Sequence, residues 1–71
     1  MSTDEMIACL GSCRDRPELA AIIAALSRRP WLNTPVEAQR LEAARAAMAS
    51  WEAYSRACQV RHNAHRLRRS R

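Results

Sequence analysis

Two pairs of side chains have the types and the spacing that could bind a metal ion. Cys9 and Cys13 are four residues apart, and so are Cys58 and His62. Residues at this spacing share one face of a helix, and three cysteines with one histidine are an accepted ligand set for structural zinc. However, Cys13 and Cys58 also continue apolar stripes, as buried thiols do. We therefore expect free buried thiols and no metal, with a zinc site, or a disulfide from Cys58 to Cys9 or Cys13, as the alternatives.

A cysteine four residues from a histidine could also act as an activated nucleophile. Near Cys58 and His62, however, the sequence offers no carboxylate to orient the imidazole, and its single glycine cannot build a loop that stabilises an oxyanion. A chain of 71 residues is also too short to bury an enzyme-sized pocket beside its core. We predict that the protein is not an enzyme and needs no cofactor.

The basic side chains are concentrated at one end of the chain. All twelve are arginines; residues 1–52 hold six of them with seven acids, whereas residues 53–71 hold the other six with no acid. Arginine pairs with phosphate through two parallel hydrogen bonds, and a cationic end concentrates on anionic partners. We therefore predict that residues 56–71 bind a polyanion, and nucleic acid is the polyanion that we favour. The predicted contact residues are Arg56, Arg61, His65, Arg66, Arg68 and Arg69.

An aromatic pair lies just before this basic end. Trp51 and Tyr54 are one turn apart, and Met48 comes one turn earlier. Tryptophan, tyrosine and arginine are enriched among the residues that dominate the binding energy of protein interfaces. Trp51 could equally pack in the core against the first helix, whereas Tyr54 falls off the apolar seam and is expected to be exposed. These three residues are the predicted protein interface.

Large apolar side chains are scarce in this chain. The sequence has six leucines, three isoleucines, two valines and no phenylalanine. A small helical hairpin with so few of them is only marginally stable. Burial against a second copy or an obligate partner would supply the missing contacts. We therefore expect a homodimer or a complex with an obligate partner.

Three helix starts have a capping sequence, in which Ser, Asp or Thr is followed three residues later by Glu. They begin at Ser2, Asp15 and Thr34. After Pro35, no proline or glycine interrupts the rest of the sequence. The pattern predicts a single all-α domain over residues 1–71. Its expected parts are helices over 3–13, 16–28 and 35–66, with the arginine-rich end at 56–71.

A short loop joins the second and third predicted helices, so they should run antiparallel. Their alanines would let the two helices approach closely. The residues expected to face each other are Ala20, Ala21, Ala24 and Ala25 on one helix and Ala43, Ala44, Ala46 and Ala47 on the other. We expect Trp31 and Leu32 to close the loop end of this hairpin.

The first helix is expected to lie along the C-terminal half of the long third helix. That packing would bring Cys9 near Cys58 and would place Asp4 and Glu5 near Arg61. The predicted fold is therefore a helical hairpin, in which one long C-terminal helix packs against two shorter N-terminal helices.

These features predict a small regulatory binding protein whose arginine-rich helix docks on nucleic acid or another polyanion. The alternative is an inhibitor or adaptor, of the kind that phages and plasmids encode, that blocks a larger host complex. It would use Trp51, Tyr54 and the arginine-rich helix against an acidic protein or nucleoprotein. The acidic N-terminus is unlike a signal peptide, and the longest apolar run, Leu19 to Leu26, is too short to span a membrane. We therefore expect a soluble, cytoplasmic protein with no membrane partner.

Overall fold

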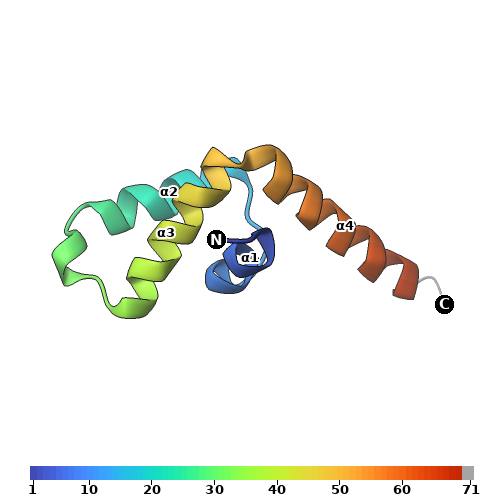
Figure 1. Cartoon of the computed structure of the whole chain (residues 1–71), viewed down its shortest axis with the longest axis horizontal. Helices are drawn as coiled ribbons and strands as arrows, with labels where there is room; N and C mark the ends of the chain where they lie inside the picture. The colour runs from blue at the N-terminus through green and yellow to red at the C-terminus, as the bar shows by residue number, and fades with distance from the viewer. Residues whose placement is uncertain (70–71) are drawn as a thin grey trace.

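A computed structural model describes the backbone of residues 1–69 and the side chains of residues 1–65. Within that part of the chain all regular structure is helical, which confirms the predicted all-α class. The elements are α1 (Thr3–Leu10), α2 (Arg16–Ser27), the short 3-10 turn η1 (Pro30–Leu32), α3 (Pro35–Ala49) and α4 (Trp51–Arg69) (Figure 1).

Side-chain caps begin the first three α-helices where the sequence predicts them. Ser2 and Asp15 each accept a hydrogen bond from the backbone N–H three residues later. Thr34 and Glu37 form a complete capping box, with N···O distances of 3.1 Å and 3.0 Å. The backbone N–H of Thr34 lowers the pKa of Glu37 by bonding to its carboxylate. The box therefore stabilises the fold above the unfolded-state pKa of Glu37, and this contribution is lost as the pH falls through the lower folded-state pKa.

The first helix is shorter than predicted because Gly11 ends it. Gly11 has a φ of +80°, and its N–H donates to the carbonyl of Ala8, which closes the last turn of α1. Glycine adopts this left-handed conformation without steric cost. The predicted extension of this helix to residue 13 is therefore wrong, and Cys13 lies in the loop between α1 and α2.

The single long helix predicted over 35–66 is broken at Ser50. This residue has φ −113° and ψ 41°, outside helical geometry, so α3 ends at Ala49 and α4 begins at Trp51. The backbone hydrogen bonds on both sides persist, from Ser50 N–H to Ala46 and from Tyr54 N–H to Ser50. The break is therefore a change of direction without a loop (Figure 1).

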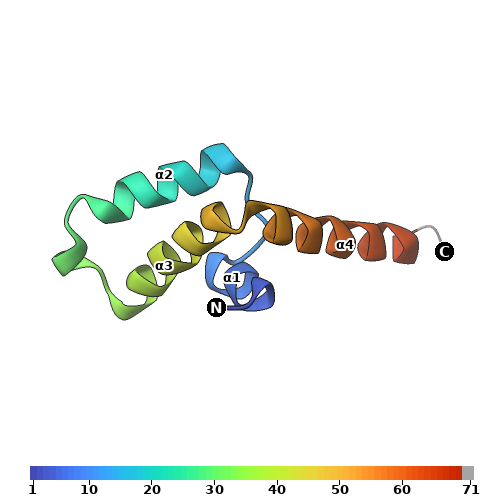
Figure 2. The same cartoon turned by 45° about the horizontal axis from the view of Figure 1, so that its top comes forward.

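The two N-terminal helices pack on α3 from different sides. α2 and α3 lie side by side and run in opposite directions, whereas α1 sits beside the end of α3 where α4 begins (Figure 2). The prediction that α1 lies along the C-terminal half of one long helix is wrong. α1 packs mainly on α3 and less on α4, because the break at Ser50 directs α4 away from the other helices.

The core is built from large side chains of α1 and α2 against alanines of α3. Ala43, Ala44 and Ala47 are completely buried, as expected for a close helix contact. The facing alanines predicted on α2 are instead exposed, at residues 20, 21, 24 and 25. The other side chains of the buried cluster are Met6, Ile7, Leu10, Leu19 and Tyr54. Large side chains on one helix therefore fill the space that small ones leave on the other.

Tyr54 is the largest buried side chain, although the sequence predicts it to be exposed. That expectation assumed a continuous helix, and the break at Ser50 changes which side of α4 faces the core. The hydroxyl oxygen of Tyr54 accepts a hydrogen bond from the backbone N–H of Arg14 at 2.7 Å. This bond joins α4 to the loop between α1 and α2.

The end of the α2–α3 pair is open. Trp31 and Leu32 were expected to close it, but 75% and 63% of their surfaces are exposed. Pro30 begins the 3-10 turn at this position, and the turn points both side chains outward, away from the core residues of α2 and α3. The predicted closure is therefore wrong.

Replacing Tyr54 with phenylalanine tests the bond to Arg14. We expect Tyr54→Phe to lower the free energy of unfolding by about 1–3 kcal/mol, because the Arg14 N–H loses its acceptor in a partly buried place. Urea denaturation followed by circular dichroism measures the change. Ser55→Ala is the control, because its hydroxyl bond to the Glu52 carbonyl is exposed. A loss for Tyr54→Phe no larger than for the control would contradict this role.

Candidate nucleic-acid interface

The outer part of α4, which follows Cys58 and comprises residues 59–69, extends away from the other helices. Every residue from 59 to 65 is exposed, including the apolar Val60. Figure 1 shows this part of α4 projecting beyond α1, α2 and α3. Most helices in proteins are stabilised by packing an apolar face. The described part of α4 after Cys58 has little such packing and is available to a partner from several sides.

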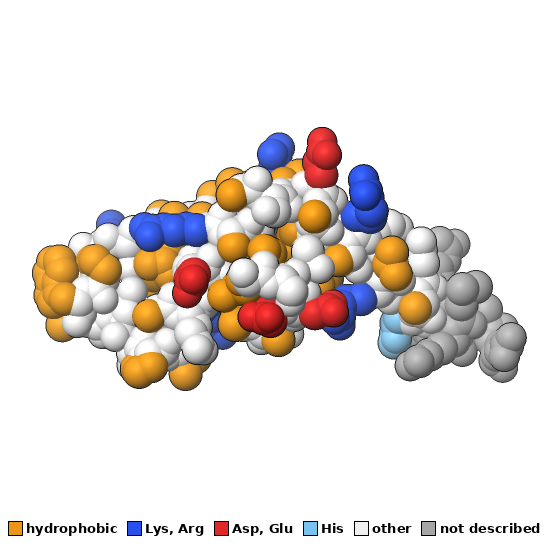
Figure 3. Space-filling view, viewed as in Figure 1, with side chains coloured by type: hydrophobic (Ala, Val, Ile, Leu, Met, Phe, Trp, Pro, Cys, Tyr) orange, Lys and Arg blue, Asp and Glu red, His pale blue; other side chains and the backbone are white. Residues whose placement is uncertain are grey.

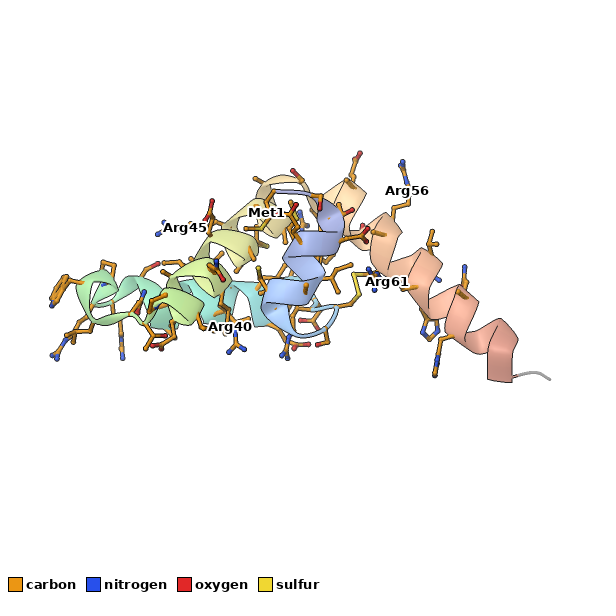
Figure 4. All side chains as sticks on the ribbon, turned by 60° about the horizontal axis from the view of Figure 1, so that its bottom comes forward. Met1, Arg40, Arg45, Arg56 and Arg61 are labelled. Carbon is orange, nitrogen blue, oxygen red and sulfur yellow. A yellow bond between two sulfur atoms is a disulfide. The ribbon has the colours of Figure 1, made fainter. Side chains whose placement is uncertain are left out.

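The structure describes three of the six residues predicted to contact a polyanion. Arg56, Arg61 and His65 are all exposed on α4. Arg56 and Arg61 extend to different sides of the helix, with Arg61 on the side toward α1 (Figure 4). The side chains of the other three, Arg66, Arg68 and Arg69, lie outside the described residues.

Arg61 forms the contact between outer α4 and the body of the protein. Its Nη2 donates to Oδ1 of Asp4 in α1 at 2.8 Å, which confirms the predicted proximity. Glu5, expected at the same place, instead accepts a hydrogen bond from the Ser2 hydroxyl. More than half of each side chain in the Arg61–Asp4 pair is exposed, and such pairs contribute little stability. A phosphate could therefore replace Asp4 at low cost.

Acidic and basic side chains are unevenly spread over the visible face of the molecule. Figure 3 shows acidic side chains over α1, next to basic side chains of α4. No acid follows Glu52 in the sequence. The positive field of α4 is therefore reduced near its contact with α1 and is not opposed by acids of its own farther along.

A disulfide joins Cys13, in the loop between α1 and α2, to Cys58 of α4. Their Cα atoms are 5.8 Å apart, within the usual range. The expectation of three free thiols is therefore wrong, and only Cys9 is free and half-buried. The sequence could not choose between Cys9 and Cys13. The end of α1 at Gly11 makes the difference, because it takes Cys13 out of the helix toward α4.

The four candidate metal ligands do not form a site in the described structure. Cys13 and Cys58 are bonded to each other, which leaves Cys9 and His62. No group of three or more His, Cys, Asp or Glu side chains in the described residues is placed to hold a metal ion.

The predicted interface of Met48, Trp51 and Tyr54 is divided between core and surface. Tyr54 is completely buried, so it cannot contact a partner. Met48 and Trp51 are half-buried and pack against the core. The guanidinium of Arg16 lies 5.2 Å from the centre of the Trp51 ring, a cation–π contact that the sequence did not indicate. The accessible surface here is therefore small.

Comparison with known proteins finds no match: no family model, no curated protein sequence and no solved structure matches this chain. In the part of the chain that the structure describes, none of the helices combines the length and the apolar composition needed to cross a bilayer.

Removing the disulfide should destabilise the fold strongly. The bond spans 45 residues, and the chain-entropy treatment of a loop of that length gives about 4 kcal/mol. We expect Cys13→Ser with Cys58→Ser to lower the urea midpoint sharply, and Cys9→Ser, which leaves the bond intact, to change it little. A thiol assay on the denatured chain should find one reactive thiol before reduction and three afterwards. Three thiols before reduction would contradict the bond.

Proposed function

We propose that this protein is a small, non-enzymatic regulatory protein whose helix α4 docks on a polyanion, nucleic acid above all. The observation that carries the proposal is the combination of charge and exposure along this helix. Residues 53–71 hold six arginines and no acid, and all residues from 59 to 65 are exposed. A helix so placed gains little from staying beside its own body and much from contact with phosphates.

The placement of the charges on α4 fits docking in a groove of nucleic acid better than docking on a flat protein surface. Arg56 and Arg61 are five residues apart, which puts them about 140° apart around a helix with 3.6 residues per turn. His65 is on the Arg61 side by the same geometry. A helix in the major groove of a duplex has phosphates on both sides, whereas a flat acidic protein surface would meet only one side of it.

The ion pair with Asp4 gives Arg61 two possible partners. Without nucleic acid, the Asp4 carboxylate holds the Arg61 guanidinium beside α1. When a phosphate approaches, Arg61 would exchange the carboxylate for it. Contacts of this kind fix position and orientation without reading sequence, so we propose binding that depends strongly on salt and weakly on sequence.

The proposal includes the predicted association with a second copy or an obligate partner. The burial of Tyr54 removes it from any such contact. The alternative function, an inhibitor that contacts a host protein through aromatic side chains, would therefore have only Trp51 for that contact. The proposed location is the cytoplasm. Disulfides are rare there, so in that compartment the less stable reduced chain would rely on the Arg14–Tyr54 bond and on the packing of α1 and α2 against α3.

Removing two arginines of α4 tests the proposal directly. We expect Arg61→Ala with Arg68→Ala to weaken binding to mixed-sequence duplex DNA and RNA. It should also flatten the log–log dependence of affinity on salt by about one unit for each lost phosphate contact. Fluorescence anisotropy at several salt concentrations measures both quantities.

The matched control is Arg28→Ala with Arg29→Ala. It removes the same charge from the end of α2, away from α4. The control should leave the slope close to that of the unchanged chain. Equal slopes for both double variants, or no binding by the unchanged chain at physiological salt, would rule out α4 as the contact.

Neutralising Asp4 should strengthen binding. Asp4→Asn removes the carboxylate that competes with phosphate for Arg61, and we expect affinity for duplex DNA to rise about twofold to fivefold at low salt. Glu42→Gln, which makes the same charge change on α3, controls for net charge and should have a smaller effect. Unchanged or weaker binding by Asp4→Asn would show that Arg61 does not exchange partners.

A further inference from the structure

The end of the α2–α3 pair carries an exposed apolar surface that the α4 proposal does not use. Trp31, Leu32 and Val36 are 75%, 63% and 67% exposed. They are three of the five exposed large apolar side chains in the described part of the chain. In Figure 3 apolar side chains cover this end of the molecule, which is opposite to α4. Apolar side chains gathered in this way commonly mark a contact surface.

Hydrogen bonds of other residues hold this turn in shape. The side-chain amide of Asn33 donates to the Leu26 carbonyl at 2.9 Å, which ties the turn to the last turn of α2. The Asn33 backbone N–H donates to the Pro30 carbonyl at 3.2 Å. Trp31 therefore takes an exposed position without contributing to the fold. Because the backbone of the turn is already fixed, only the side chain of Trp31 has to be ordered when it binds.

Two arginines border the same surface. A hollow next to Leu32 has apolar walls from Ala25 and Leu26 and charged walls from Arg28 and Arg29. The one carboxylate at this hollow, that of Glu37, already accepts the Thr34 N–H in the capping box. The lining of the hollow thus combines apolar side chains with two guanidinium groups and one carboxylate, and its net positive charge complements an apolar side chain flanked by carboxylates.

We propose that this tip, consisting of Arg28, Arg29, Trp31, Leu32 and Val36, docks on a protein segment that presents an apolar side chain between acidic ones. A symmetric contact between two copies would gather four arginines and only two Glu37 carboxylates in one interface, and this excess of like charge disfavours it. A single-stranded nucleic acid would use Trp31 and the arginines, but it would leave the aliphatic Leu32 and Val36 without a complementary surface.

The tip and α4 lie at opposite ends of a molecule whose Cα atoms span 47 × 20 × 20 Å. One protein partner and one polyanion could therefore bind at the same time. The tip does not depend on the α4 proposal, because the two surfaces share no residue. If the test of one proposal fails, the other proposal can still stand.

A random peptide library displayed on phage is the test, with the full disulfide-bonded chain as the immobilised target. We expect enriched peptides to contain a large apolar residue with Asp or Glu on both sides. A synthetic peptide of the enriched sequence should lose about tenfold in affinity with Trp31→Ala, with Leu32→Ala, and with Arg28→Ala plus Arg29→Ala. Val60→Ala is the matched control, because Val60 is equally exposed but lies on α4, and it should bind the peptide unchanged.

Circular dichroism and duplex DNA binding, both unchanged in the tip variants, would show that the loss is local to the tip. A Trp51→Phe background makes Trp31 the only tryptophan, so that its emission reports on the tip alone. No enriched peptide, or peptide binding that survives all the tip variants, would overturn the proposal. A Trp31 emission shift with oligothymidylate or phosphatidylglycerol vesicles, and none with the peptide, would overturn it in favour of those partners.

Discussion

The fold depends on the junction where the loop between α1 and α2 meets the first turns of α4. Two interactions form this junction: the Arg14–Tyr54 hydrogen bond and the Cys13–Cys58 disulfide. The chain has few large apolar side chains, and a hydrophobic core alone would be marginal at this length. The junction adds a buried aromatic ring and a covalent bond at the place where the helices diverge. Without it, α4 would be attached to the body mainly through the break at Ser50.

Local signals in the sequence predicted where α1, α2 and α3 begin, and long-range packing decided how the helices meet. The caps at Ser2, Asp15 and Thr34 appear in the structure because a cap needs only residues three positions apart. By contrast, no proline or glycine in the sequence indicates the break at Ser50. We attribute the break to the contacts of Tyr54 and Cys58 with Arg14 and Cys13 in the loop between α1 and α2. The local sequence around Ser50 does not contain this information.

The same distinction applies to the candidate contact residues. Exposure of Arg56 and Arg61 was predictable, because arginine is rarely buried. The pairing of Arg61 with Asp4 was predicted from the packing of α1 along the C-terminal half of one long helix, and the pair forms although α1 packs mainly on α3. By contrast, the roles of Tyr54 and Trp31 were exchanged, since the tyrosine expected at the surface is in the core and the tryptophan expected to close the loop is exposed. Aromatic residues fit either place, so only the packing can decide between them.

The junction also bears on the proposed use of α4 as a contact surface. The disulfide fixes the base of outer α4 at Cys58, while the next attachment, the Arg61–Asp4 pair, is exposed and weak. In the proposed docking, the polyanion would have to displace only one exposed carboxylate, and it would meet a helix whose starting position is already set. The loss of freedom on binding is then limited to side chains and outer turns. A strong attachment at the base of outer α4, followed by a weak one beyond it, would suit the proposed docking of this helix on an anionic partner.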